Sequence, residues 1–331
     1  MINVLELQLN TANYKDFLQH LSEELQIKLI DNRIILPESF GTGYMQLVEL
    51  PNGLESLVSD ITYHIDVMYK REKMDQYFCI LHFNDVELSG SIQFVKNGTF
   101  LEDKSERRAG VAFTSSHNDF SFVVKAKTKA KSINILLPEE WMNNNLSAYD
   151  ELSTLSRFTS FGNTLTHPEP FDTQNRILFD EVFHTGEKHP LKQMMIKNRI
   201  MLLLEHFLLR IYRNMTNVAE GTKRKIKSSD LSKLMEIESL LVRDFGQPPP
   251  TIVNLAERTG MSVSKLKAAF KKVYGTGIYE YYQKNRMLKA RSLLFTGQYT
   301  VKQVGQQLGY TNLSNFSLAF RKEFGILPSH V

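Results

Sequence analysis

Short apolar runs separated by turn-forming residues occupy the first 137 residues and predict a β-rich region. A short helix is expected before them, near residues 14–25. Glycine and asparagine separate the runs, for instance at Gly53, Gly90 and Asn118. The expected strands are Met45–Leu50, Ser56–Val67, Tyr77–Phe83, Ser91–Val95, Ala109–Thr114, Phe120–Ala126 and Ser132–Leu137. Short strands with this spacing favour a small barrel or a jelly roll.

From Pro138 onward the apolar spacing changes to the period of helices. Residues 192–212 carry a wide apolar stripe, and interrupting charges exclude a membrane span. The stripe consists of Met195, Ile196, Leu202, Leu203, Phe207, Leu208 and Ile211. A helix buried beneath the β-rich region and a dimerisation helix explain this stripe equally well. Another amphipathic helix is expected at Asp230–Phe245, followed by a proline corner and a helix capped by Thr251.

The last eighty or so residues contain the same pattern twice. The matched residues are Leu255-Ala256, Gly260, Phe270-Lys271-Lys272 and Gly275 in the first copy, and Val304-Gly305, Gly309, Phe320-Arg321-Lys322 and Gly325 in the second. The offset is 49 at the first glycine pair and 50 at the last, so one residue is inserted in the second copy. Each copy reads as a short helix, a turn and a second helix. This is the helix-turn-helix, whose second helix lies in the major groove of DNA.

The residue types in each copy suit this geometry. Ala256 and Gly305 supply a small residue where two helices cross closely, and the glycine four residues later tolerates a positive φ. The side-chain oxygens of Ser262 and Thr311 are placed to cap the second helix. The apolar residues of that helix lie four apart and share an inward face. Two ordinary hairpins with solvated lysines would be the better interpretation of a single copy, but two matched copies disfavour it.

The outward faces carry side chains that reach base edges and phosphates. The predicted DNA-binding residues are Ser262, Ser264, Lys265, Lys267, Ala268, Lys271, Lys272 and Arg286, together with Thr311, Leu313, Ser314, Asn315, Leu318, Arg321 and Lys322. We expect Ser264, Lys267, Ser314 and Asn315 at or near base edges. Phosphate or scaffold positions are expected for Lys271, Lys272, Arg286, Arg321 and Lys322.

The distribution of charge supports a nucleic-acid partner. Residues 229–331 hold 14 Lys and Arg against 7 Asp and Glu, a net charge of +7, whereas the rest of the chain has a net charge of −3. Between the two copies, Ile278–Phe295 reads as one rigid helix. Such a helix would hold the two recognition helices apart, so that they enter successive major grooves about 34 Å apart.

These residues resemble the AraC/XylS family of bacterial transcription regulators. The resemblance covers about residues 229–331 and is carried by both copies, by Tyr281, Arg286 and Ala290 between them, and by Pro328-Ser329. It implies a DNA-binding domain that is homeodomain-like, with two helix-turn-helices. Relatives often carry long polar side chains at the positions of Ala268 and Leu318, so apolar contact with thymine methyl groups is expected to matter more here.

The same resemblance implies a cupin-like, jelly-roll sensor in the N-terminal region. The expected fold is therefore a multidomain α+β protein. Its domains are a β-rich sensor at residues 1–137, a helical linker and dimerisation region at 138–227, and an all-α DNA-binding domain at 228–331. Dimerisation is the favoured role for the helix at 192–212, because regulators that read repeated sites usually pair.

Enzymatic and metal chemistry find little support in the sequence. The chain has a single cysteine, Cys79, in an apolar run, where a buried reduced thiol is expected. A metal-binding cupin needs two histidines one residue apart, and no His-x-His occurs. His82 precedes Glu87 by five positions, which does not complete such a ligand set. We therefore expect no metal, no cofactor and no catalytic residues, and pocket residues are not separable from core residues by pattern. Aromatic and basic candidates for a pocket are Tyr44, Tyr63, Tyr69, Arg71, Tyr77 and Phe94.

The sequence thus predicts a sequence-specific transcription regulator that responds to an effector and is not an enzyme. Its expected partners are double-stranded promoter or operator DNA, a second copy of the chain, RNA polymerase and a small-molecule effector. No signal peptide is evident, so a cytoplasmic location without membrane contact is expected. The alternative is a ligand-binding cupin-like enzyme with a helical accessory domain. A third interpretation gives the N-terminal half only a protein-binding or dimerising role.

Overall fold

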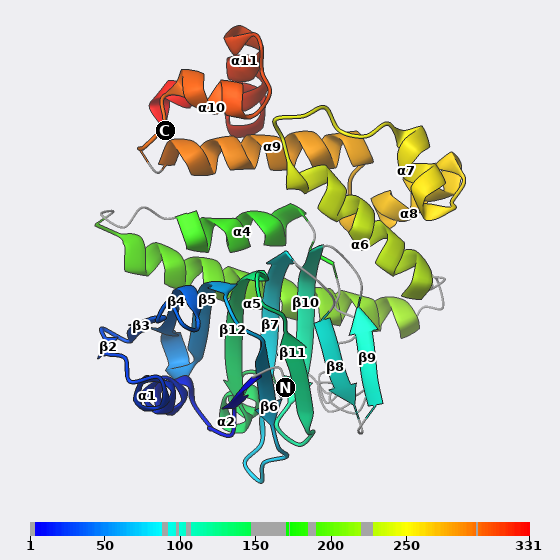
Figure 1. Ribbon diagram of the computed structural model, residues 1–331. Helices are drawn as coiled ribbons and strands as arrows, with labels where there is room; N and C mark the ends of the chain where they lie inside the picture. The colour runs from blue at the N-terminus through cyan, green and yellow to red at the C-terminus, as the bar shows by residue number, and fades with distance from the viewer. Residues whose placement is uncertain are drawn as a thin grey trace. The chain divides into compact units, whose positions relative to one another are not determined.

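The computed structural model describes residues 4–87, 92–96, 99–103, 107–146, 170–171, 173–184, 190–219, 228–295 and 297–331. The chain forms two compact units. Unit 1 comprises Met1–Glu169 and Phe207–Lys223, and unit 2 comprises Pro170–His206 and Arg224–Val331. Strands build unit 1 and helices build unit 2 (Figure 1), which confirms the β-rich N-terminal and helical C-terminal regions.

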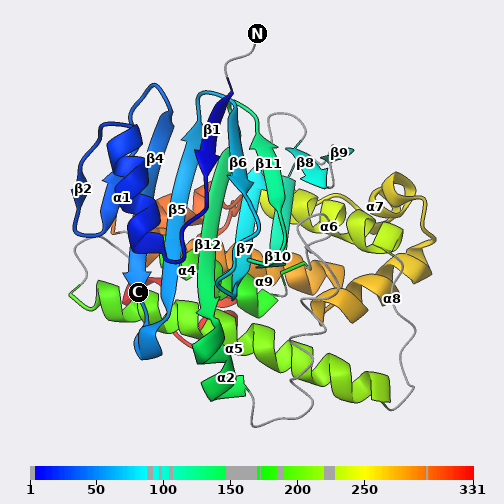
Figure 2. The same cartoon turned by 90° about the horizontal axis from the view of Figure 1, so that it is seen from below.

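Two β-sheets form unit 1 within the described residues (Figure 2). The five-stranded sheet has the order β1-β6-β11-β8-β9, made of Leu5–Gln8, Val67–Arg71, Phe120–Val124, Ile92–Lys96 and Thr99–Asp103. The seven-stranded sheet has the order β10-β7-β12-β5-β4-β3-β2, made of Arg107–Ser115, Phe78–Glu87, Lys129–Pro138, Glu55–Tyr63, Gly41–Glu49, Arg33–Ile35 and Leu29–Ile30. Neighbouring strands pair antiparallel except β1 and β6, which are parallel.

The two sheets share one apolar core. Leu7 of β1 and Tyr69 of β6, from one sheet, belong to the same buried cluster as Leu57 of β5 in the other. Helix α1 (Tyr14–Glu24) buries Phe17, Leu18 and Leu21 in this cluster, because these residues recur at helical spacing on one face. Burial of both inner sheet faces against each other is what keeps the sheets together.

One long strand expected from the sequence is two strands in the structure. The expected run 56–67 ends at Tyr63, where His64 donates its backbone N–H to the carbonyl of Phe40. The carboxylate of Asp66 accepts hydrogen bonds from the Ala126 N–H and the Lys125 ammonium, each at 2.9 Å. These bonds stabilise a turn that carries the chain from one sheet to the other, so β6 begins at Val67. The prediction of one continuous strand at residues 56–67 was therefore wrong.

The short strands were not predicted from the sequence. The strands that were missed are two to five residues long: β1, β2, β3, β6 and β9. The longer expected strands are confirmed, with ends that differ by a few residues. Strands this short carry too little pattern to stand out from loops.

Within the described residues, three helices follow the sheets: α2 (Glu139–Leu146), α4 (Thr173–His184) and α5 (Lys192–Ala219). The boundary between the two compact units falls within α5, after His206. Leu203 and Phe207 of the expected apolar stripe are buried, while Leu202 is exposed. The domain boundaries and the dimerisation role that we expect from the sequence stay predictions.

Unit 2 contains both copies of the repeat. The first copy is α7 (Ile252–Thr259) and α8 (Val263–Tyr274), and the second is α10 (Val301–Gln307) and α11 (Leu313–Phe324). Helix α6 (Ser228–Arg243) precedes them, α9 (Ile278–Phe295) connects them, and a short 3-10 turn at Pro328–His330 follows. The two helix-turn-helices and the single connecting helix are confirmed.

The connecting helix α9 is part of two apolar cores. Its first half contributes Tyr281 and neighbours to a cluster with Leu255, Leu266 and Phe270 of the first copy. Its second half contributes Met287, Ala290, Leu293 and Leu294 to a cluster with Val304, Phe316 and Phe320 of the second copy. Each copy is therefore held on its own stretch of one helix, which sets the position of one copy relative to the other.

Candidate nucleic-acid interface

The turn of each copy follows the geometry expected from its glycines. Gly260 has a φ of 61° and Gly309 a φ of 74°, both in the left-handed region that favours glycine. A Cβ atom on Gly305 would lie 2.8 Å from Cδ2 of Leu313, so the second copy has no room for a larger residue at this helix crossing. Ala256 is buried at the matching position of the first copy. The roles predicted for these four residues are confirmed.

The capping residue predicted for the recognition helix is confirmed in the first copy and wrong in the second. The Ser262 hydroxyl accepts a hydrogen bond from the Lys265 N–H at 3.3 Å, and Thr251 caps α7 in the same way. In the second copy the cap is Asn312, whose side-chain oxygen accepts from the Ser314 N–H at 2.8 Å. Thr311 is exposed, and its side chain caps no helix in the described part of the chain. The inserted residue lies in the turn and moves the start of α11 by one position.

Helix α8 turns its predicted contact residues to solvent. Leu266 and Phe270 are fully buried, and the residues on the other side are exposed: Ser264, Lys265, Lys267, Ala268, Lys271 and Lys272. The ammonium of Lys265 pairs with Asp230 of α6 at 2.9 Å, so this charge is directed toward α6. Lys267 has no hydrogen-bond or ion-pair partner for its side chain among the described residues. It is the better placed of the two to reach a nucleic acid.

Helix α11 presents a different surface with the same geometry. Phe316 and Phe320 are fully buried, and Ser314, Asn315, Arg321 and Lys322 are exposed. Leu318 is 66% exposed, a high value for a leucine, and Leu313 is half-buried against Gly305. Both cations lie in the last turn of the helix, whereas its first two turns are polar or apolar and uncharged. The exposed leucine fits the expected apolar contact with thymine methyl groups.

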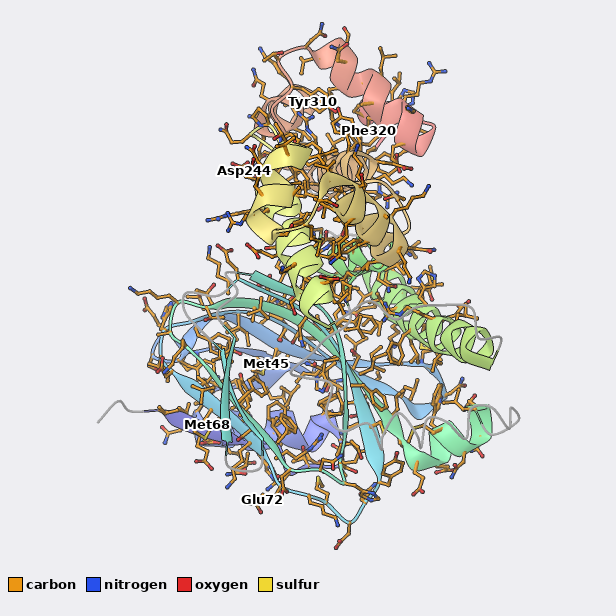
Figure 3. The ribbon with its side chains drawn as sticks, turned by 90° about the vertical axis from the view of Figure 1, so that its right-hand side faces the viewer. Met45, Met68, Glu72, Asp244, Tyr310 and Phe320 are labelled. Atoms are coloured by element: carbon orange, nitrogen blue, oxygen red, sulfur yellow. The ribbon has the colours of Figure 1, made fainter. Side chains whose placement is uncertain are left out.

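Arg286 is half-buried in unit 2 and acts as a scaffold residue there. Its Nε donates a 2.8 Å hydrogen bond to the carbonyl of Leu308, at the C-terminal end of α10. The guanidinium also lies 3.9 Å from the ring centre of Tyr310, which Figure 3 labels beside the second copy. A cation at a helix C-terminus satisfies an orphan carbonyl and the helix dipole. Of the two roles predicted for Arg286, the geometry supports the scaffold.

A buried ion pair holds α6 against its neighbours in unit 2. Arg176 of α4 donates to the carboxylate of Glu238 on α6 at 2.8 Å, and the Tyr281 hydroxyl of α9 donates to the same oxygen at 2.8 Å. Glu238 is only 3% exposed. Burial raises the pKa of Tyr281 well above its usual value, and the charge of Glu238 adds to this effect. The sequence carries no signal for this cluster, because Arg176 and Glu238 are 62 positions apart.

Unit 1 contains a cavity of about 180 Å³ between its sheets. Tyr63 and Tyr69, two of the sequence candidates for a pocket, line it, together with Tyr14, Phe120 and Phe122. Tyr44 and Tyr77 lie elsewhere: the guanidinium of Arg33 lies over the ring of Tyr44, and the ring of Tyr77 packs at a tilt against that of His117. The side chain of Phe94 lies outside the described residues. Met45, labelled in Figure 3, also lines the cavity.

Polar groups cross one wall of this cavity. His82 shares hydrogen bonds with Asn134 at 2.8 Å and with Thr114 at 2.9 Å. Asn134 in turn donates to Ser132, whose hydroxyl pairs with that of Ser59 at 2.6 Å. Burial lowers the pKa of His82 to about 4, so this histidine is neutral at neutral pH. The wall offers hydrogen bonds but no charge.

Other chemistry is limited in the part of the chain that the structure describes. No group of three or more His, Cys, Asp or Glu there is arranged to bind a metal ion. Cys79 is a buried free thiol whose pKa is raised to about 11 by burial. None of the described helices is long and apolar enough to cross a membrane.

Comparison with known proteins gives two family matches. Residues 255–331 match a helix-turn-helix domain. Residues 40–220, more than half of the chain, match the N-terminal domain of regulatory protein PchR.

Individual relatives match shorter segments. The HTH-type transcriptional regulator AlkR of Acinetobacter baylyi is 30% identical over 89 residues, which cover 27% of this chain and 29% of AlkR. Regulatory protein PchR of Pseudomonas aeruginosa is 36% identical over 70 residues, 21% of this chain and 23% of PchR. The chain thus spans about a quarter of the length of these relatives. A solved AraC-type transcriptional regulator from Chromobacterium violaceum is 29% identical, covering 31% of this chain and 92% of that one, with a TM-score of 0.29.

Proposed function

Since the chain belongs to the AraC/XylS family of transcription regulators, with a PchR-type N-terminal domain, we propose that it binds DNA sequence-specifically through both helix-turn-helices. One observation carries this proposal: α8 and α11 bury matched apolar faces, and the outer face of each ends in two adjacent cations. An exposed, cationic recognition helix is what the major groove accepts. Two of them on one connecting helix would enter adjacent grooves.

The proposed roles follow from position and chemistry. Lys267 and Ser264 of α8, with Asn315 and Ser314 of α11, contact base edges or lie next to them. Phosphate contacts come from the cations at the helix ends: Lys271, Lys272, Arg321 and Lys322. Ala268 and Leu318 contact thymine methyl groups. Arg286 orients the second copy from within.

The test starts by mapping where the protein binds across its genome, since the bound sites define an operator. Footprinting on that operator then compares the native chain with a Lys267→Ala, Asn315→Ala double variant. We expect the double variant to lose about 1–3 kcal/mol of discrimination at each base that these residues read. The matched control is Lys73→Ala, which removes an exposed lysine of unit 1. An unchanged sequence preference in the double variant would reject the base-reading roles.

The remaining parts of the proposal concern the whole protein. The N-terminal unit is a sensor for a small-molecule effector, and the protein is a cytoplasmic, non-enzymatic homodimer that acts on RNA polymerase at promoters. Support for a sensor comes from the cavity in unit 1, and support for a dimer from Leu202 and Leu209, which are exposed on one face of α5. Sedimentation of the native chain and of a Leu202→Glu, Leu209→Glu variant tests the dimer. A native monomer would overturn that part alone.

A further inference from the structure

Polar side chains lie on the inner face of the seven-stranded sheet of unit 1, where they line the cavity. They come from β5, β7 and β12 and form the polar patch: Ser59, His82, Asn84, Ser132 and Asn134. The register places Ser132 between Ser59 and Asn84, and it places Asn134 beside His82. A sheet face packed inside a sandwich is normally apolar, because burial of a polar group is unfavourable. The position of the patch therefore indicates a role other than packing.

The polar patch keeps surface that a ligand can reach. Four of its five residues are partly exposed, and only Ser59 is buried. The residues between them on β7 and β12 are buried instead, with Phe83 and Ile133 at 0% exposure. Alternate residues of a strand point to opposite faces. The residues that keep accessible surface are thus the ones that face the cavity.

The hydrogen bonds within the patch leave donors unused. Nδ2 of Asn134 donates to the hydroxyl of Ser132 at 3.1 Å, and the hydroxyls of Ser132 and Ser59 lie 2.6 Å apart. Their mutual bond uses one of the two hydroxyl hydrogens, so the other has no partner in the part of the chain that the structure describes. The amide of Asn84 has no hydrogen-bond partner among the described residues either. One row across β5, β12 and β7 therefore offers a free hydroxyl and a free amide to the cavity.

None of the described residues that line the cavity carries a charge at neutral pH. His82 is kept neutral by burial, which lowers its pKa to about 4. The guanidinium of Arg71 lies 4.5 Å from the ring centre of Phe120, but Arg71 is only 1% exposed and does not line the cavity. An ionised group inside the cavity would lose its hydration without gaining an opposite charge, which is strongly unfavourable. The cavity therefore selects against charged molecules.

Aromatic rings of the five-stranded sheet line the same cavity. The ring of Phe122 stacks on Tyr69 at 5.1 Å between centres and on Phe120 at 5.9 Å. Such a series of rings favours an aromatic or other planar ligand. A cavity of about 150 Å³ is enough for benzene, so the 180 Å³ here accepts one ring with a short substituent.

We propose that the cavity of unit 1 binds an uncharged, single-ring aromatic molecule that carries a hydrogen-bond acceptor such as a carbonyl oxygen. The ring lies against Tyr69, Phe120 and Phe122. The oxygen accepts from the amide of Asn84 and from the free hydroxyl of the Ser59–Ser132 pair. An apolar pocket with a few convergent polar groups is the usual form of a small-molecule site. This inference names the class of effector, and it rests on the proposed regulatory function only for the effect of binding on DNA.

Three probes of similar size test the ligand class by isothermal titration calorimetry of the full chain without DNA. Acetophenone has the ring and the carbonyl, ethylbenzene lacks the oxygen, and benzoate carries a negative charge. We expect saturable binding of acetophenone and at least tenfold weaker binding of benzoate, because the charge of benzoate would be buried without a partner. Acetophenone that does not saturate, or benzoate that binds as tightly, would overturn the proposal.

Two variants test the contacts with the carbonyl oxygen. Asn84→Ala and a Ser59→Ala, Ser132→Ala double variant should each raise the Kd of acetophenone about fivefold, the value of one hydrogen bond. Neither should change the Kd of ethylbenzene more than twofold, since ethylbenzene accepts no hydrogen bond. The control is Ser121→Ala, because Ser121 lies on β11 between Phe120 and Phe122 and points away from the cavity.

The outcome with ethylbenzene separates a contact from a structural role. Equal losses of affinity for acetophenone and ethylbenzene, or unchanged affinity for acetophenone in both variants, would overturn the proposed contacts. Asn84→Ala breaks no side-chain hydrogen bond among the described residues, so it remains a valid test if the double variant does not fold.

A gel shift on the mapped operator, with and without acetophenone, separates this inference from the proposed function. Acetophenone binding that leaves the DNA affinity unchanged would refute the sensor role alone. DNA binding by a chain that does not bind acetophenone would refute this inference alone.

Discussion

The two helix-turn-helix copies share a backbone plan but carry different outer faces. Helix α8 has four lysines, and the structure directs one of them, Lys265, to an ion pair with Asp230. Helix α11 has two cations, both in its last turn, and an exposed leucine where α8 has Ala268. Charge attracts any phosphate backbone, whereas side chains such as Asn315 and Leu318 distinguish bases. The comparison indicates that the first copy contributes more to general affinity and the second more to sequence preference.

The copies also differ in their polar anchors within unit 2. The first copy packs beside the buried group of Arg176, Glu238 and Tyr281, so its position depends on an ion pair without access to solvent. The second copy is anchored by Arg286, which donates to a backbone carbonyl of α10 and is half-buried. Removal of a partner from a buried ion pair costs more than loss of a bond to a carbonyl. The first copy is therefore expected to be the more sensitive to a single substitution.

The largest effect is expected from Glu238→Ala. This change leaves the buried guanidinium of Arg176 without its carboxylate, so the free energy of unfolding should fall by about 3–5 kcal/mol. Urea denaturation of the full chain measures the loss. The matched control is Glu236→Ala on the same helix, because Glu236 forms an exposed pair with Arg258 at 2.7 Å and should contribute less than about 1 kcal/mol. Equal losses in the two variants would show that the buried pair is no special anchor of the first copy.

A smaller effect tests the inserted residue of the second copy. Asn312→Ala should destabilise the chain by about 1 kcal/mol, as Ser262→Ala should in the first copy, because each removes the acceptor at the start of a recognition helix. Thr311→Ala is the control and should change the free energy of unfolding by less than about 0.5 kcal/mol. Thermal denaturation followed by circular dichroism distinguishes them. If Thr311→Ala lowered the free energy of unfolding more than Asn312→Ala, Thr311 would be the cap, as predicted from the sequence.

These caps show which features of unit 2 could be predicted from the sequence and which could not. Glycines with positive φ, capping side chains and helical spacing are local signals, and they predicted the ends of α9 and the turns of both copies. The position of the inserted residue was ambiguous, because Thr311 and Asn312 are adjacent and both side chains cap helices. The sequence shows the insertion only through the offset between distant glycines. Helix packing, which the sequence does not display, decides between them.

In the β-rich unit, local sequence patterns did not identify the residues that line the cavity. Tyr63 and Tyr69 line the cavity and were pocket candidates because of their chemistry, but no local pattern separates them from Arg71, Tyr44 or Tyr77, which do not line it. Cavity lining depends on which distant strands pair, as β6 does with β11, about fifty residues later. The interior position of Tyr14, from a helix before the sheets, was missed for the same reason. Long-range pairing is the information that pattern analysis lacks.

The smallest effects distinguish the outer faces of the two copies directly. Lys271→Ala in α8 should weaken binding to all DNA sequences and reduce the slope of log K against log salt by about 1, because one phosphate contact is lost. Leu318→Ala in α11 should leave that slope unchanged and raise the Kd for the operator roughly fourfold, the value of one buried methylene at ~0.8 kcal/mol. Neither change should alter the free energy of unfolding by more than about 0.5 kcal/mol, since both side chains are exposed. Fluorescence anisotropy on operator and scrambled duplexes at several salt concentrations measures both quantities. If Leu318→Ala weakened both duplexes equally, α11 would have no larger share in sequence preference than α8, and the contrast between the two copies would be one of charge alone.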